Sequence, residues 1–127
     1  MSSVSLTTRL TITLCFMALL MAVSIIPGHT QSDDSVLIRL VAKTPKLLQK
    51  VLHFLLYGVL TMLWVWILNA ILSESYPLVI AFTIAVLYGA AMEWYQTKVP
   101  GRFSTFLDVA LNAAGAVLGL FAAILFL

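Results

Sequence analysis

Four apolar stretches, separated by polar breaks, make up most of the chain. The first covers residues 10–26 and ends at Pro27, and the others cover 47–72, 76–96 and 105–127. A helix needs about 17–25 mainly apolar residues to cross a bilayer, and each stretch meets that length or comes close to it. The pattern predicts an all-α, polytopic membrane protein: a four-transmembrane-helix bundle that forms one domain over residues 1–127.

The first stretch also resembles a secretory signal peptide. Arg9 would be its charged start, and Ala22-Val23-Ser24 would be its small-residue cleavage site. We expect a retained helix instead, because the apolar run is long for a signal peptide and no soluble domain follows it.

The segment 28–46 is the longest polar stretch of the chain. Ser32 or Asp33 could cap a short helix there, and Pro45 would end it before the second span. The apolar residues of this helix would be Val36, Leu37, Leu40 and Val41. We expect it to be amphipathic and to lie in the headgroup layer of the membrane.

The composition agrees with a protein that is embedded in a lipid bilayer. Of the 127 residues, 62% are hydrophobic and 9% are charged, and the mean hydropathy is +1.08, whereas soluble domains have about 25% charged residues. A small water-soluble core could not bury so much apolar surface. The net charge of +2 and the lack of a basic run exclude a nucleic-acid surface. The single cysteine excludes an internal disulfide, and no motif for a metal or another cofactor is present.

Charged residues gather on one side of the predicted membrane. Because spans alternate in direction, the segments 28–46 and 97–104 lie on the same side. That side receives almost all charged residues of the chain: Asp33, Asp34, Arg39, Lys43, Lys46, Lys50, Glu93, Lys98, Arg102 and Asp108. The other side keeps only Arg9 and Glu74. Taken literally, the positive-inside rule then places the charged side in the cytoplasm and both termini outside.

Several polar residues lie inside the spans, at similar depth on the charged side. His53 and Tyr57 share a face of the second span, since residues four apart are neighbours on a helix. Gly89, Glu93 and Gln96 share a face of the third span, and Asp108, Asn112, Gly115 and Gly119 share a face of the fourth. Intramembrane ionisable residues are costly unless they are paired or hydrated. If the three faces meet, they form one polar pocket.

Each of these residues also has a purely structural interpretation. His53 could be an interfacial histidine, Glu93 the ion-pair partner of Arg102 or Lys98, and Asp108 a helix cap. Asn112 could join helices by hydrogen bonding. Gly115 and Gly119 form a GxxxG pattern that allows close helix packing, either within the chain or in a homo-oligomer.

Arg102 suggests what such a pocket would bind. It follows Pro100-Gly101, directly before the predicted fourth span. A guanidinium beside the free N–H groups of a helix start forms an anion site. At a membrane surface this anion would be the phosphate of a lipid headgroup or of a polyprenyl carrier. His53 could then transfer protons, with Glu93 or Asp108 as the base.

Four sequence blocks resemble the VanZ-like family of bacterial membrane proteins. They are Lys50-x-x-His53-x-x-x-Tyr57, Glu93-x-x-Gln96, Pro100-Gly101-Arg102-x-Ser104 and Asp108-x-x-x-Asn112-x-x-Gly115. Thr105 stands where many members have Asp, which makes a metal site less expected. The resemblance implies a multi-pass protein of the bacterial inner membrane, linked to resistance against the glycopeptide teicoplanin or to envelope stress, with no established biochemical activity.

Two classes of function remain open. The first is binding, and perhaps modification, of an anionic lipid or cell-envelope precursor. For this class we predict catalytic roles for His53, Glu93 and Asp108, and ligand binding by the remaining polar positions of the blocks: Lys50, Tyr57, Gln96, Arg102 and Asn112. The second is a non-catalytic accessory or partner-binding protein whose polar cluster only joins helices.

Overall fold

The computed structural model describes residues 4–24, 46–98 and 106–127. Within these ranges the chain forms four helices: α1 (Leu6–Ser24), α3 (Lys46–Leu68), α4 (Tyr76–Gln96) and α5 (Phe106–Phe126). Each is long and apolar enough to cross a membrane. The described part contains no strand, so the prediction of an all-α, four-span bundle is confirmed. The interfacial helix predicted within 28–46 falls almost entirely outside the described residues.

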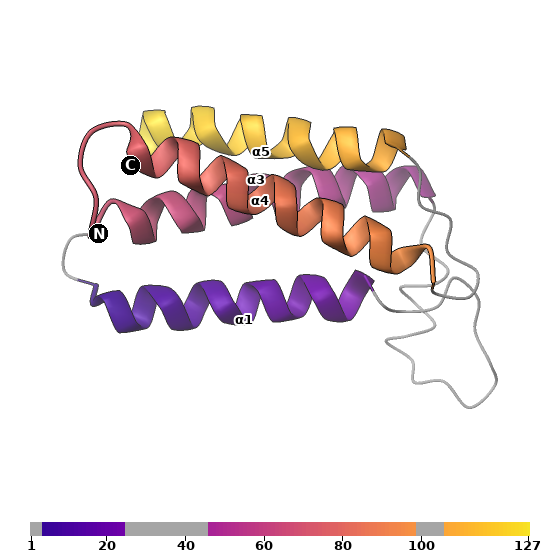
Figure 1. The fold of residues 1–127 in the computed structure, drawn as a ribbon, viewed down its shortest axis with the longest axis horizontal. Coiled ribbons are helices and arrows are strands. Elements are labelled where there is room, and N and C mark those ends of the chain that lie inside the picture. The colour runs from indigo at the N-terminus through magenta and orange to yellow at the C-terminus, as the bar shows by residue number, and fades with distance from the viewer. Residues whose placement is uncertain (1–3, 25–45, 99–105) are drawn as a thin grey trace.

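The helices run in alternating directions, as Figure 1 shows. The end of α1, the start of α3, the end of α4 and the start of α5 lie at one end of the bundle, which we call the site end. The start of α1, the end of α5 and the α3–α4 turn lie at the other end, which we call the terminal end. Among the described residues, this arrangement places Lys50, Glu93, Lys98 and Asp108 toward the site end, and Arg9 and Glu74 toward the terminal end.

Two helix ends differ from the predicted spans by four residues. α1 begins at Leu6 rather than at residue 10, because the Ser5 hydroxyl accepts a hydrogen bond from the Thr8 N–H at 3.2 Å and so caps the helix. α3 ends at Leu68 rather than at 72. Tighter turns follow Leu68, and Glu74 then takes a positive φ of 63°, a conformation that reverses the chain direction.

The closest helix contact joins α3 to α5 through glycines. Gly115 lies against the main-chain carbonyl of Phe54, and Gly119 lies against that of Gly58, so closely that a Cβ atom at either position would overlap the carbonyl. Small residues allow this approach, and in lipid close van der Waals packing is a main force between helices. The glycines of α5 therefore act within the chain, while a homo-oligomer formed through them stays a prediction.

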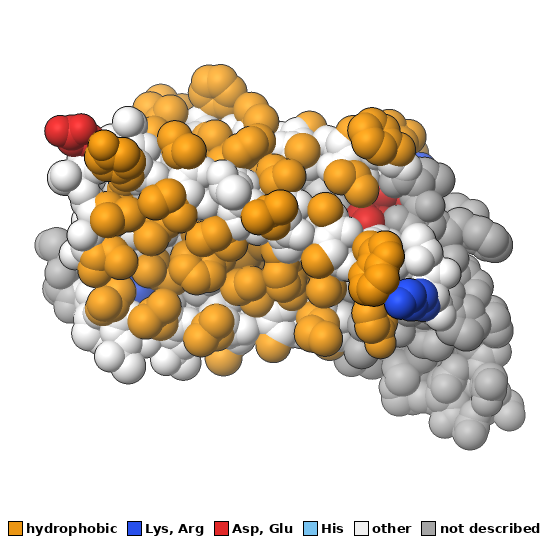
Figure 2. Space-filling model, in the orientation of Figure 1, with side chains coloured by type: hydrophobic (Ala, Val, Ile, Leu, Met, Phe, Trp, Pro, Cys, Tyr) orange, Lys and Arg blue, Asp and Glu red, His pale blue; other side chains and the backbone are white. Residues whose placement is uncertain are grey.

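The core of the bundle is shared by all four helices. Leu20 of α1, Leu60 of α3, Ala85 of α4 and Ala116 of α5 are buried together in one cluster. Outside it, apolar side chains cover much of the surface, and the charged side chains visible in Figure 2 lie toward the two ends. A surface of this kind matches a lipid environment.

Polar side chains join α1 to the rest of the bundle. The Tyr88 hydroxyl of α4 donates to the Met17 carbonyl at 2.5 Å, and the Gln96 amide donates to the Ser24 carbonyl at 3.1 Å. Both bonds link elements that are far apart in sequence. They join α1 to α4, while retention of the first apolar stretch stays a prediction.

Candidate functional site

A buried carboxylate lies inside the site end of the bundle. Glu93 is in the last turn of α4 and is 6% exposed, although it belongs to a helix that could span the membrane. The Asn112 amide of α5, which is 2% exposed, donates a hydrogen bond to Glu93 Oε1 at 3.3 Å. A carboxylate buried among apolar helices costs free energy unless it has such partners. The pair therefore forms the centre of the candidate site.

Tyr57 of α3 completes this centre. Tyr57 is 1% exposed. Its ring lies near Asn112, and both side chains occupy the space beside Gly89 of α4. A Cβ atom at Gly89 would lie 3.1 Å from Tyr57 Cε1 and 3.3 Å from Asn112 Nδ2. Glycine at position 89 thus lets side chains from α3 and α5 meet over α4. Tyr57, Glu93 and Asn112 are brought together from three helices, as their sequence faces predicted.

The other ionisable candidates lie at the same end. His53 is about two turns from the start of α3 and is half-buried, and Lys50 lies one turn closer to that start. Asp108 is in the first turn of α5, where the helix dipole favours an acidic side chain. Among the described residues, no group of three His, Cys, Asp or Glu side chains is arranged to hold a metal ion. His53, Lys50 and Asp108 therefore lie at the same end of the bundle as the Glu93–Asn112 pair.

The Gln96 side chain has a hydrogen-bond partner that the sequence did not predict. Its side-chain amide donates to the Ser24 carbonyl of α1, and both residues are buried. The bond satisfies a main-chain carbonyl at the end of α1, which has no partner within its own helix. A ligand that contacts this amide nitrogen would have to share or replace the bond.

Two further cations, Lys98 and Arg102, follow Glu93 in sequence, and of these only Arg102 was predicted to bind a ligand. The Lys98 ammonium lies 3.9 Å from the centroid of the Trp94 ring, in a cation–π contact, and both residues are exposed. Arg102 lies outside the described residues, so its predicted anion site stays a prediction.

Sequence reasoning missed Gly58 as part of the site scaffold. Gly58 follows Tyr57 directly, and a Cβ atom there would lie 3.1 Å from the Gly115 carbonyl oxygen. The only signal for this contact in the sequence was a glycine in one span that could pack against the GxxxG pattern of another span. Such a signal becomes specific only when the helix pairing is known.

The fold and the buried polar centre define a class of protein: a multi-pass helical membrane protein with an ionisable cluster inside one end of its bundle. The chain belongs to the VanZ/LLP1 family, whose sequence model matches residues 4–127. This match confirms the resemblance drawn from the four sequence blocks. No curated protein and no solved structure matches the chain.

Proposed function

We propose that this VanZ-family protein binds an anionic lipid or cell-envelope precursor in a polar pocket at the site end of its bundle. The observation that carries the proposal is the buried Glu93–Asn112 pair, with Tyr57 beside it. Polar and ionisable groups are expensive in the apolar part of a membrane, and where they persist they commonly serve binding, transport or proton transfer.

The charges around the pair favour a phosphate-bearing ligand. Lys50 lies in the second turn of α3, at the same end of the bundle as Glu93, and Arg102 follows α4 in sequence. Guanidinium and ammonium groups bind phosphate through charge-assisted hydrogen bonds. The carboxylate and the Asn112 amide would then contact hydroxyl or amide groups of the same ligand. A phosphate-bearing lipid or polyprenyl-linked precursor whose headgroup also carries hydroxyl or amide groups fits both requirements.

In cells, the proposal places the protein in the bacterial inner membrane, where it would act on envelope precursors and influence susceptibility to glycopeptides such as teicoplanin. The basis is family membership together with the ligand chemistry above. If the pocket is catalytic, His53 is the group for proton transfer, and Glu93 or Asp108 is the base.

A second candidate is an accessory protein in which the polar cluster only joins helices. The Gln96–Ser24 bond favours it, since this bond links α4 to α1 and accounts for one of the predicted ligand residues without any ligand. The Glu93–Asn112 bond also joins two helices. The two candidates differ in whether a bound molecule is lost when the cluster is changed.

The proposal predicts that a phosphate-bearing lipid purifies with the wild-type protein and is lost from Arg102→Ala. Mass spectrometry of lipid extracted per mole of purified protein measures this. Lys98→Ala is the matched control, because it removes one positive charge at the same end from a side chain that rests on Trp94. Equal lipid content in wild type, control and Arg102→Ala would contradict the proposal and favour the accessory role.

The charge count further predicts that the site end faces the cytoplasm. Lys and Arg concentrate in the segments 28–50 and 97–104, whereas Arg9 is the only such residue near the terminal end. In a Cys15→Ala background, Ser73→Cys on the α3–α4 turn should react with a membrane-impermeant thiol reagent added to intact cells. Ser32→Cys should react only after lysis. The reverse pattern would place the pocket on the outer side of the membrane.

A further inference from the structure

A second polar site lies at the terminal end, where the sequence offered only one basic residue. Arg9 belongs to the second turn of α1 and is only 7% exposed. Its Nε donates to the Val4 carbonyl at 3.2 Å, and its Nη1 donates to the Trp66 carbonyl of α3 at 2.5 Å. The guanidinium carbon lies 5.0 Å from the centroid of the Trp66 ring. These contacts hold a positive charge in a fixed position near the membrane surface.

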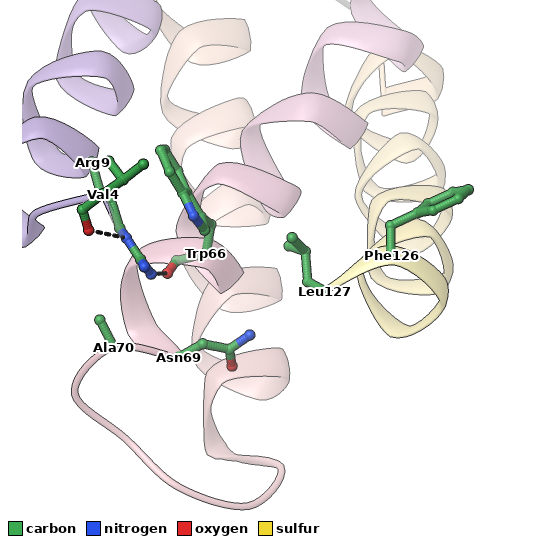
Figure 3. Close-up of a pocket in the computed structure, with 7 residues that line it drawn as sticks. All are labelled: Val4, Arg9, Trp66, Asn69, Ala70, Phe126 and Leu127. Carbon is green, nitrogen blue, oxygen red and sulfur yellow. Dashed lines mark hydrogen bonds between the residues drawn. The ribbon is translucent and has the colours of Figure 1, made fainter. Parts of the chain in front are cut away.

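This guanidinium lines a cavity of about 480 Å³. In Figure 3 the Arg9 guanidinium points toward the Trp66 carbonyl. Asn69 and Ala70, which follow α3 in sequence, also line the cavity. Phe126 and Leu127 at the end of α5 form an apolar side of the cavity. The cavity thus combines a charged polar part with an apolar part, as a binding site for an amphiphile would.

The polar groups of the cavity provide two kinds of hydrogen-bond donor. Arg9 is the only ionisable side chain among the lining residues, and Asn69 adds an amide. One cation beside a neutral donor favours an anion with several acceptor oxygens.

We propose that this cavity binds a phosphate group at the membrane face opposite the Glu93 site. The phosphate oxygens would accept from the Arg9 guanidinium and the Asn69 amide, and a lipid ligand would place its apolar part along Phe126 and Leu127. The phosphate comes either from a lipid headgroup of that leaflet or from solution. This inference is independent of the function proposed for the site end.

Arg9 also has a structural role, which decides how the site must be tested. Its bond to the Trp66 carbonyl ties α1 to the last turn of α3, where carbonyls lack partners within the helix. Substitution of Arg9 would therefore change packing as well as charge. Ala70 is a better position, because it is exposed, lines the cavity and lies just beyond the end of α3.

The test compares Ala70→Glu with Ala70→Gln, two side chains of almost equal size. The glutamate places a negative charge beside Arg9, where it should compete with a phosphate and weaken binding about tenfold or more. The glutamine should leave binding close to that of wild type. Binding is measured on the full chain in nanodiscs of neutral lipid, with added phosphatidylglycerol in one arm and inorganic phosphate in the other. A ligand bound at the site end contributes equally in both variants.

Weaker phosphatidylglycerol binding in Ala70→Glu alone, with equal thermal unfolding of the two variants, supports a lipid phosphate. The same loss for inorganic phosphate alone supports the site with a soluble ligand. Binding that is equal in the two variants, or that wild type lacks in both arms, would overturn the proposal.

Discussion

Replacing Gly115 with alanine is expected to lower the free energy of unfolding by about 3 kcal/mol. The added Cβ would overlap the main-chain carbonyl of Phe54, and a carbonyl cannot move aside as a flexible side chain can. α3 and α5 would have to separate, and the contacts that depend on their close approach would weaken. Gly119→Ala should have a similar effect, because its Cβ would meet the Gly58 carbonyl. Titration with a denaturing detergent, followed by circular dichroism, measures both losses.

Ala114→Val is the control for these glycine variants. Ala114 belongs to the same helix and is exposed toward the surrounding lipid. Added methyl groups there meet no neighbouring helix, so the free energy of unfolding should change by no more than about 0.5 kcal/mol. If Gly115→Ala were as stable as this control, the close α3–α5 contact would be wrong.

Asn112→Leu is expected to lower the free energy of unfolding by about 2 kcal/mol. The leucine removes the amide that donates to Glu93 and leaves the carboxylate, already 6% exposed, among apolar helices with one bond fewer. Replacing both partners is expected to cost much less, because two apolar side chains of similar size leave no buried charge behind. The double variant Glu93→Leu/Asn112→Leu should therefore recover most of the lost stability.

The same detergent titration measures the three variants, and together with the wild type they complete a double-mutant cycle. The coupling between the two sites should be of the order of 1–2 kcal/mol, as for polar contacts between helices in membranes. Additive losses would show that Glu93 and Asn112 do not act as a pair.

The spans were predictable because apolar length alone determines which segments cross a membrane. Their ends were less predictable. The Ser5–Thr8 cap that starts α1 lies among other hydroxyl residues and does not stand out in the sequence. The end of α3 at Leu68 precedes three further apolar residues, Ala70, Ile71 and Leu72, so hydropathy placed it too late. A helix end depends on local hydrogen bonding, which hydropathy does not report.

The centre of the candidate site was also predictable, since helical spacing placed Tyr57, Glu93 and Asn112 on the three helix faces that would form a pocket if they met. The partners of Gln96 and Arg9 were not. Each of these side chains donates to a main-chain carbonyl of another helix, and carbonyls carry no sequence signal. Such contacts become visible only when the rotation of each helix in the bundle is known.

The central claim is that the polar cluster at the site end binds a ligand and does more than join helices. The most direct measurement is the lipid content, by mass spectrometry, of wild type and of Glu93→Leu/Asn112→Leu purified from the same membranes. We expect a phosphate-bearing lipid that remains with wild type and is absent from the double variant, although the two proteins unfold at similar detergent concentrations. The same lipid in equal amount on both proteins would contradict the claim.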